Sequence, residues 1–311
     1  MEPDVRRFWR GFWQVADPKI WIASTVPMGV GGAMAYGATG TFHWYWFFVS
    51  LIGVYFIEIG KNAVNDFVDF NTGVDLMVAP EKRTPFSGGK RAIVDGNLTL
   101  REAAVITAIT LTAGSLVGVY IGFLREPGIL WIGCTGLFFA AAYSLPPFKL
   151  AYRGMGEAVV GVTFGPLIVS GAFLVQTHYL SMEVILASLP IGFLIANVLF
   201  INQYPDFEAD SQGNKRNWVV RLGKTRGIIV YAALFTATYI SLVVLSAVTG
   251  NPFWLLPFIT LPLVIRAVKI ASRYCDDIPN CIPANANTIK TYQITGAAMV
   301  LAGIMTRFFH I

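Results

Sequence analysis

Apolar residues occur in stretches of about 20 along the whole chain, and shorter polar segments separate these stretches. A helix of that length crosses the hydrocarbon core of a bilayer. Backbone amides and carbonyls find no water there, so each stretch must be helical. The pattern predicts nine transmembrane helices, at residues 20–42, 44–66, 102–124, 127–145, 155–177, 182–204, 227–249, 252–271 and 289–309.

The first 18 residues differ from these stretches, because arginines are mixed with phenylalanines and tryptophans in "MEPDVRRFWRGFWQVADP". This mixture is typical of an amphipathic helix that lies at a membrane interface. The segment also lacks the small-residue cleavage site of a signal peptide. We therefore expect residues 1–18 to form an interfacial helix that leads into one membrane-embedded domain, residues 1–311.

The composition agrees with a polytopic membrane protein. Hydrophobic residues make up 55% of the chain and charged residues only 13%, whereas soluble domains carry about 25% charged residues. The net charge of +5 suits a protein that faces anionic lipid, and it does not indicate binding to nucleic acid. Of the three cysteines, Cys275 and Cys281 share a stretch without histidine, so neither a disulfide scaffold nor a zinc site is expected.

Charge placement predicts the orientation of the helices. With the N-terminus in the cytoplasm, 21 of the 23 basic residues fall on the cytoplasmic side, and only Arg125 and Arg307 fall outside. Such an excess follows the positive-inside rule. Of the 18 acidic residues, only Glu126 and Glu183 are expected outside. The polar chemistry is therefore expected on the cytoplasmic face of the plasma membrane.

Two related motifs close the second and the sixth predicted span. "NDFVDF" occupies residues 65–70 and "NQYPDF" residues 202–207, and both read Asn, any, aromatic, any, Asp, Phe. Each leads into a basic segment, so residues 67–100 and 205–226 are expected to be cytoplasmic active-site loops. The repeat predicts two parallel four-helix halves plus a ninth helix, with the two acidic ends facing each other across a central cavity.

The acidic residues of the motifs indicate a metal site. On a helix, Asp66 and Asp69 share a face, and so do Asp206 and Asp210. Facing carboxylate pairs repel unless cations lie between them, and Mg²⁺ binds carboxylates together with phosphate oxygens. Cationic donors for a diphosphate follow nearby, namely Lys82, Arg83, Lys90, Lys149, Arg153, Lys215 and Arg216. The alternative is that these charges only anchor helix ends at the interface.

A third polar stretch, "YSLPPFKLAYRGMGE", covers residues 143–157. The hydroxyl groups of Tyr143 and Ser144 can bond phosphate oxygens, while an ordinary proline-broken loop is the alternative. Glu58 precedes the first motif by one to two turns, where it either pairs with Lys61 or lines the cavity.

The three histidines, His43, His178 and His310, are all expected on the outer side. None can therefore act as a general base for a reaction on the cytoplasmic side. A secondary transporter also contains repeats, but it needs polar groups on the outer half as well, and the spans are otherwise almost free of charge. Residues 274–287 are expected to be a polar loop, in which Asp276 and Asp277 are alternative acceptor contacts.

Four blocks in order resemble the UbiA superfamily of intramembrane prenyltransferases: "NDFVDFNTGVD", "RTPFSGG", "YSLPPFKLAYRGMGE" and "NQYPDFEADSQGNKRNWVVRLG". Together with the number of spans, the blocks cover nearly the whole chain. Gly73 and Asp75 in the first block, and "VVRLG" in the last, are similar to the branch that includes the 1,4-dihydroxy-2-naphthoate prenyltransferases of menaquinone synthesis. Gln203 departs from the pattern, since it stands where the first repeat has Asp66, and "SGGKRAIVDG" differs from the commoner proline-rich loop.

The resemblance implies an all-helical bundle, two Mg²⁺ ions, an isoprenyl diphosphate whose tail enters an apolar tunnel, and an aromatic acceptor. Carried over by position, the metal ligands would be Asn65, Asp66 and Asp69 for one ion and Asp206 and Asp210 for the other. The diphosphate would contact Asn65, Arg83, Ser144, Lys149, Arg153, Lys215 and Arg216, with Tyr143 at the leaving group. Other acceptors stay open (4-hydroxybenzoate, homogentisate, a chlorophyllide, a haem or an ether lipid), as do a terpene cyclase and the oligomeric state.

Overall fold

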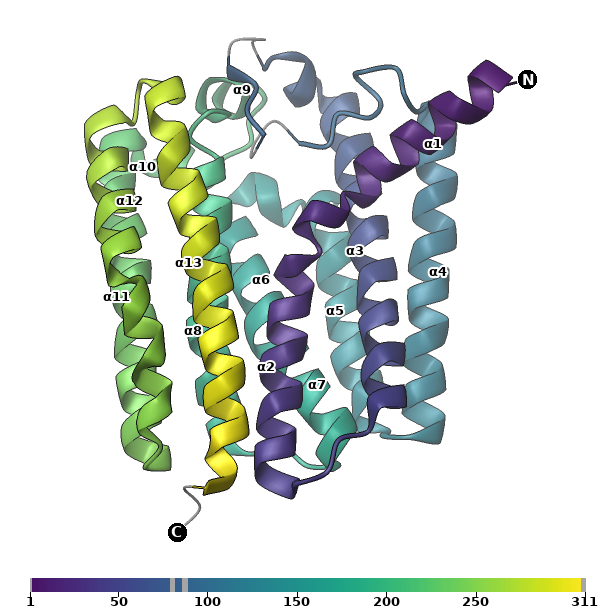
Figure 1. Cartoon of the computed structure of the whole chain (residues 1–311). Helices are drawn as coiled ribbons and strands as arrows, with labels where there is room; N and C mark the ends of the chain where they lie inside the picture. Colours follow the sequence, from purple (N-terminus) through teal and green to yellow (C-terminus); the bar gives the residue numbers. More distant parts are fainter. Residues whose placement is uncertain (1, 79–81, 86–88, 309–311) are drawn as a thin grey trace.

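The computed structural model describes residues 2–78, 82–85 and 89–308, and this part of the chain is built from helices that run mostly side by side (Figure 1). The α-helices are α1 Glu2–Ala16, α2 Ile22–Thr39, α3 Trp44–Thr72, α4 Leu100–Leu124, α5 Gly128–Ser144, α6 Gly156–Val162, α7 Ile168–Thr177, α8 Met182–Asn202, α9 Phe207–Gln212, α10 Trp218–Leu222, α11 Lys224–Thr249, α12 Leu261–Tyr274 and α13 Ile278–Met305. Shorter 3₁₀ or π turns are η1 Pro18–Ile20, η2 Val74–Leu76, η4 Leu150–Arg153, η5 Thr163–Leu167, η6 Pro252–Thr260 and η7 Thr306–Phe308.

Each predicted span coincides with a helical segment of the structure. Six segments of the described chain are long and apolar enough to cross a membrane: α3, α4, α8, α11, the run from α6 to α7 and the run from η6 to α12. α5 is apolar but shorter. The all-helical architecture is confirmed, while the nine-span count and the cytoplasmic N-terminus stay predictions.

Close helix packing depends on small residues in α2. A Cβ atom on Gly31 would overlap the carbonyl oxygen of Val169 in α7, and one on Gly37 would overlap that of Gly303 in α13. Small residues let backbones approach in this way, which compensates for the weak hydrophobic driving force between helices in lipid. α2 is therefore held between α7 and α13.

Two boundaries differ from the sequence-based expectations. The stretch expected to be a polar loop at 274–287 is mostly helical, because α13 already begins at Ile278. Asp277 caps that helix by accepting from the Asn280 amide, and Pro279 lies in the first turn, where a missing amide hydrogen costs nothing. The stretch 67–100 likewise starts inside α3, which continues to Thr72.

The two acidic motifs also differ in structure. The first lies inside the continuous helix α3, whereas the second spans the end of α8, a turn and the start of α9. Pro205 explains the break, because proline lacks the amide hydrogen needed to continue α8. Asp206 therefore stands at the N-cap of α9 rather than within a long helix.

The N-terminal segment is helical, and α1 crosses one end of the bundle beside α3 (Figure 1). Arg7 pairs with Glu102 at 2.6 Å, and Asp17, just after α1, pairs with Lys90 at 2.6 Å. The Gln14 amide donates to the carbonyl oxygen of Lys90 at 2.7 Å. α1 therefore fastens the loop that follows α3; its position at a membrane interface stays a prediction.

Candidate active site

Asp69 and Asp210 are brought together around one ammonium group. Lys215 Nζ lies 2.9 Å from Asp69 Oδ2 and 3.9 Å from Asp210 Oδ1. Asn65, one turn before Asp69 on α3, donates its side-chain amide to the same Asp69 Oδ2 at 2.9 Å. Asp69 of the first motif and Asp210, three residues after the second motif, thus meet at one end of the bundle, where α9 also lies (Figure 1).

Asp210 is buried and Lys215 is half-buried in this cluster, and their charges depend on each other. Asn217 donates to Asp210 Oδ2 at 2.7 Å. Burial raises the pKa of Asp210 to about 7, although the Lys215 charge opposes the rise. Burial alone would lower the pKa of Lys215, but the charges of Asp69 and Asp210 raise it well above its usual value. The charge of Asp206 also acts on Asp210, so Asp206 belongs to the same cluster.

Asp66 faces the loop after α3. The side chain is only 2% exposed, and its Oδ2 accepts a hydrogen bond from the Ile93 amide at 3.1 Å. Its Oδ1 is buried and has no hydrogen-bond partner in the described part of the chain. One carboxylate oxygen therefore holds the loop, and the other is available for a cation.

Asp75 is a site residue for which the sequence predicted no role. Its carboxylate is buried, and Oδ2 has no partner among the described residues. Burial raises the pKa of Asp75 to about 8, and the nearby charge of Asp69 adds to the rise. The feature of the sequence that could have identified Asp75 is its position two residues after Gly73 in the first block.

Tyr152 was missed by the sequence-based reasoning. Its hydroxyl donates to Asp69 Oδ1 at 2.6 Å and lies 2.7 Å from Thr72 Oγ1. The ammonium groups of Lys149 and Lys215 lie 5.2 and 5.6 Å from the centre of its ring, close enough for cation–π attraction. Tyr152 stands in "KLAYR" between two of the predicted diphosphate contacts, but nothing in the spacing distinguishes it from a packing tyrosine.

Arg91 was also missed as a site residue. Its side chain is only 6% exposed, yet none of its three guanidinium nitrogens has a hydrogen-bond partner in the described residues. It adopts a left-handed backbone with φ of 57° and lies two residues before Ile93, whose amide binds Asp66. A buried guanidinium without a partner is costly, and an anionic ligand would satisfy it.

The other predicted cations take several positions. Lys82 pairs with Glu208 at 3.0 Å, and Lys90 is drawn to Asp17, so neither faces Asp69. Three of the predicted cationic donors are exposed to solvent: Arg83, Arg153 and Arg216. Of the predicted cationic contacts, Lys215 pairs with Asp69 directly, and Lys149 lies over the ring of Tyr152, which donates to Asp69.

Tyr143 and Ser144 lie at the end of α5, and both are buried. Ser144 Oγ has no partner among the described residues. The charges of Asp69 and Lys215 act on Tyr143, whose ring lies 5.8 Å from Lys61 Nζ. Tyr143 therefore stands between the acidic cluster and the apolar interior.

The two histidines that can be placed lie away from the acidic cluster, while their position on the outer side of the membrane stays a prediction. His43 precedes α3, at the opposite end of that helix from Asp69, and His178 ends α7, where it pairs with Glu126 at 2.8 Å. His310 lies outside the described residues.

These side chains fit a divalent metal that a phosphate ligand completes. Within residues 2–78, 82–85 and 89–308, no three His, Cys, Asp or Glu side chains converge closely enough to hold a metal unaided. Mg²⁺ usually takes one or two carboxylates and fills its shell with water and phosphate oxygens, so such a convergence is not required. The buried oxygens of Asp66 and Asp75 that lack partners are suited to that role.

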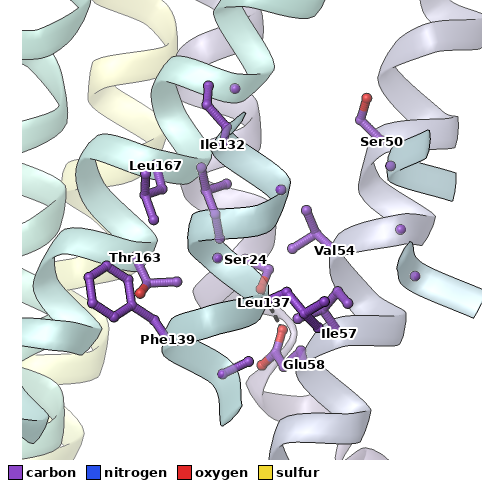
Figure 2. A pocket seen from close by; sticks show the side chains of 18 of the residues that line it. Ser24, Ser50, Val54, Ile57, Glu58, Ile132, Leu137, Phe139, Thr163 and Leu167 are labelled. Carbon is purple, nitrogen blue, oxygen red and sulfur yellow. Dashed lines mark hydrogen bonds between the residues drawn. The ribbon is translucent and has the colours of Figure 1, made fainter. Parts of the chain in front are cut away.

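An apolar cavity of about 180 Å³ begins beside Tyr143. It follows α5 from Tyr143 back to Ile129, which corresponds to roughly 20 Å of helix. Figure 2 shows Glu58 and Ser24 at one end and Ile132 and Leu167 farther along. Its lining is apolar apart from a few hydroxyl groups and two charged residues, Glu58 and Lys61.

Part of the cavity wall consists of glycines that packing does not require. No atom lies within 4 Å of where a Cβ would stand on Gly118, Gly133 or Gly136. These glycines leave room next to the cavity, in contrast to Gly31, which is pressed against a neighbouring helix.

Comparison with known proteins gives consistent results. The chain is 28% identical over 290 residues to a 2-carboxy-1,4-naphthoquinone phytyltransferase from Synechocystis, covering 90% of this chain and 88% of that protein. It is also 28% identical over 302 residues to a 1,4-dihydroxy-2-naphthoate octaprenyltransferase from Bacillus subtilis. This match covers 96% of this chain and 93% of that protein.

Among solved structures, a UbiA homologue from Aeropyrum pernix shares the fold with a TM-score of 0.69 and 18% identity, covering 91% of this chain and 98% of that one. A UbiA homologue from Archaeoglobus fulgidus bound to GPP and Mg²⁺ has a TM-score of 0.62 and 18% identity, covering 96% and 99%. The UbiA prenyltransferase family itself matches residues 24–280. The chain therefore belongs to the UbiA prenyltransferase family and is an integral membrane prenyltransferase.

Proposed function

We propose that this enzyme transfers a prenyl group from an isoprenyl diphosphate to 1,4-dihydroxy-2-naphthoate, with Mg²⁺ as the metal, in menaquinone biosynthesis. The observation that carries the proposal is the meeting of Asp69 and Asp210 around Lys215, next to an apolar cavity that begins beside Tyr143. The naphthoate prenyltransferases among the relatives support the acceptor, and the Archaeoglobus homologue bound to GPP and Mg²⁺ supports the donor and the metal.

The metal would be held by the side-chain oxygens of the acidic cluster, namely Asn65, Asp66, Asp69, Asp75, Asp206 and Asp210. When bound, divalent ions neutralise the negative charge that develops on a departing diphosphate. Tyr152 keeps Asp69 in position through its 2.6 Å hydrogen bond. Asn65 fixes the other Asp69 oxygen, so the carboxylate is oriented before the donor arrives.

The cationic side chains would bind the diphosphate itself. Lys215, Lys149 and Arg91 are the cations nearest to the acidic cluster or lacking other partners. The exposed Arg83, Arg153 and Arg216 would attract the donor as it enters, since charges at a site mouth raise the local concentration of a charged ligand. Tyr143 and Ser144 would lie at the leaving oxygen.

The reaction would proceed at the boundary between these charges and the cavity. The C–O bond of the donor breaks, the electron pair leaves with the diphosphate, and an allylic cation remains. The apolar walls exclude water, which would otherwise quench the cation. A ring carbon of the acceptor attacks, the new C–C bond forms, and loss of the proton from that carbon restores the aromatic ring. We also propose that this chemistry faces the cytoplasm at the plasma membrane, as the distribution of basic residues indicates.

The test is to incubate the purified full-length protein with Mg²⁺, geranylgeranyl diphosphate and single acceptors, and to identify products by mass spectrometry. The acceptors are 1,4-dihydroxy-2-naphthoate, 4-hydroxybenzoate and homogentisate, with one reaction lacking any acceptor. We expect prenylated naphthoquinol only with the naphthoate. Prenylation of a different acceptor would replace the proposed one, and a cyclic hydrocarbon formed without acceptor would refute transfer to an aromatic ring.

A further inference from the structure

Two charged residues line the cavity but have no part in the chemistry described so far. Glu58 and Lys61 lie one turn apart on α3, in the cavity lining at the end that Tyr143 closes. The Ser24 hydroxyl donates to Glu58 Oε2, as Figure 2 shows. Glu58 therefore lines the cavity and is held by α2 rather than by a salt bridge to Lys61.

Lys61 has no anionic partner in direct contact. In the described part of the chain it forms no hydrogen bond and no ion pair. Its Nζ lies 5.8 Å from the centre of the Tyr143 ring, within range of a cation–π attraction. The Glu58 charge attracts it, while that of Lys90 repels it. Lys61 is half-buried in a mostly apolar lining. An ammonium group in such a place gains from a charged partner, so an anionic group of a ligand fits there.

The position of Lys61 on α3 relates it to the reaction. Lys61, Asn65 and Asp69 follow each other at intervals of four, so all three lie on one face of the helix. Eight residues correspond to roughly 12 Å along the axis, which places Lys61 two turns deeper than Asp69. A donor with its diphosphate at Asp69 and its tail in the cavity would have its reacting carbon between these two levels.

The donor cannot supply the partner that Lys61 lacks. Its tail is hydrocarbon, and its diphosphate lies at the level of Lys215, two turns away along α3. The acceptor has to reach the reacting carbon, and it therefore enters the same space beside Tyr143. According to their names, both relatives described above act on an acceptor that has a carboxyl group on a naphthalene ring system.

We propose that Lys61 and Glu58 form the acceptor-recognition site, in which Lys61 pairs with the carboxylate of a hydroxylated aromatic acid and Glu58 accepts a hydrogen bond from its ring hydroxyl. This inference rests on the function proposed above. A cation and an anion one turn apart match a ligand that presents an acidic oxygen beside a hydroxyl donor. Both residues are positioning residues that select the acceptor and orient its ring.

The experiment compares steady-state kinetics of purified wild-type, Lys61→Met, Lys61→Arg and Glu58→Gln proteins with Mg²⁺ and geranylgeranyl diphosphate. The acceptors are 1,4-dihydroxy-2-naphthoate and 1,4-dihydroxynaphthalene, which lacks the carboxyl group. Lys269→Met is the matched control, because Lys269 is an exposed lysine on α12. Size-exclusion chromatography and thermal unfolding check that each variant is folded.

Lys61→Met is expected to raise the KM for the naphthoate about tenfold or more, as loss of a charge-assisted hydrogen bond predicts. The KM for geranylgeranyl diphosphate should change by less than about twofold, because Lys61 makes no contact with the donor in this proposal. The wild-type preference for the carboxylated acceptor should disappear in Lys61→Met and largely return in Lys61→Arg. Glu58→Gln should weaken binding of both acceptors, since each keeps the ring hydroxyls.

Three results would overturn the proposal. A rise in the donor KM with an unchanged acceptor KM would assign Lys61 to the diphosphate. Unchanged kinetics in Lys61→Met and Glu58→Gln, with an active wild type, would remove the recognition site but leave the proposed function standing. A wild type that prenylates no aromatic acid would remove both. If Lys61→Met does not fold, an unaltered acceptor KM in Glu58→Gln is sufficient to reject the site.

Discussion

The hydrogen bond from Tyr152 to Asp69 gives the sharpest test of the acidic cluster. Tyr152→Phe removes only the hydroxyl that donates to Asp69 Oδ1 at 2.6 Å. A hydrogen bond to a charged group contributes about 1.5–3 kcal/mol. The other Asp69 oxygen keeps its bonds from Asn65 and Lys215 at 2.9 Å, so part of the orientation survives. We therefore expect a loss of about 1–2 kcal/mol, which corresponds to roughly 5- to 30-fold in kcat/KM.

The assay follows product formation at saturating acceptor while the Mg²⁺ and donor concentrations are varied. The apparent affinity for Mg²⁺ should fall together with kcat/KM, because a less constrained carboxylate is a poorer ligand. Tyr179→Phe serves as the control, since Tyr179 is exposed and follows α7, away from the acidic cluster. If Tyr152→Phe is folded and retains wild-type kcat/KM and Mg²⁺ affinity, the orienting role of Tyr152 is wrong.

Further predictions concern the metal, the diphosphate and the helix packing. Asp69→Ala and Asp206→Ala should each abolish turnover in folded protein, and EDTA should abolish wild-type turnover until excess Mg²⁺ restores it; product formation by either variant would contradict the assigned roles. Arg91→Met should raise the donor KM about tenfold without lowering the thermal unfolding midpoint, because its guanidinium has no described partner to lose; a lower midpoint with normal KM would mean a structural role. Gly31→Leu should destabilise the protein by about 2 kcal/mol or more, measured as a lower unfolding midpoint in detergent, because α7 leaves no room for the side chain.

The sequence predicts the helices well because the hydrocarbon core imposes one simple rule on length and polarity. The sequence does not predict where a helix breaks or begins when this depends on local backbone geometry. Pro205 moves Asp206 out of a continuous helix and onto the cap of α9, so the two motifs are similar in letters but not in backbone. The start of α13 was not predicted, because the polar residues around Asp277 were interpreted as a loop although Asp277 is the N-cap of this helix.

The acidic pairs of the site were found because their spacing is local, whereas the residues that contact them across the fold were not. Tyr152 reaches Asp69 from 83 positions away. The burial of Arg91 depends on a left-handed backbone and on the loop that Asp66 and α1 hold in place. Lys90 resembled a diphosphate contact in the sequence, and only the packing of α1 across the bundle explains its pairing with Asp17.

The glycine-lined wall of the cavity has a consequence for the size of the donor that this protein can accept. Because nothing packs against Gly118, Gly133 and Gly136, a larger side chain at any of them would enter the space proposed for the tail without displacing a neighbouring helix. The relatives described above are named as a phytyltransferase and an octaprenyltransferase, and these two prenyl groups differ greatly in length. Single substitutions at these glycines are therefore expected to change the length of isoprenoid that the cavity accepts while the charged site and the helix packing stay intact.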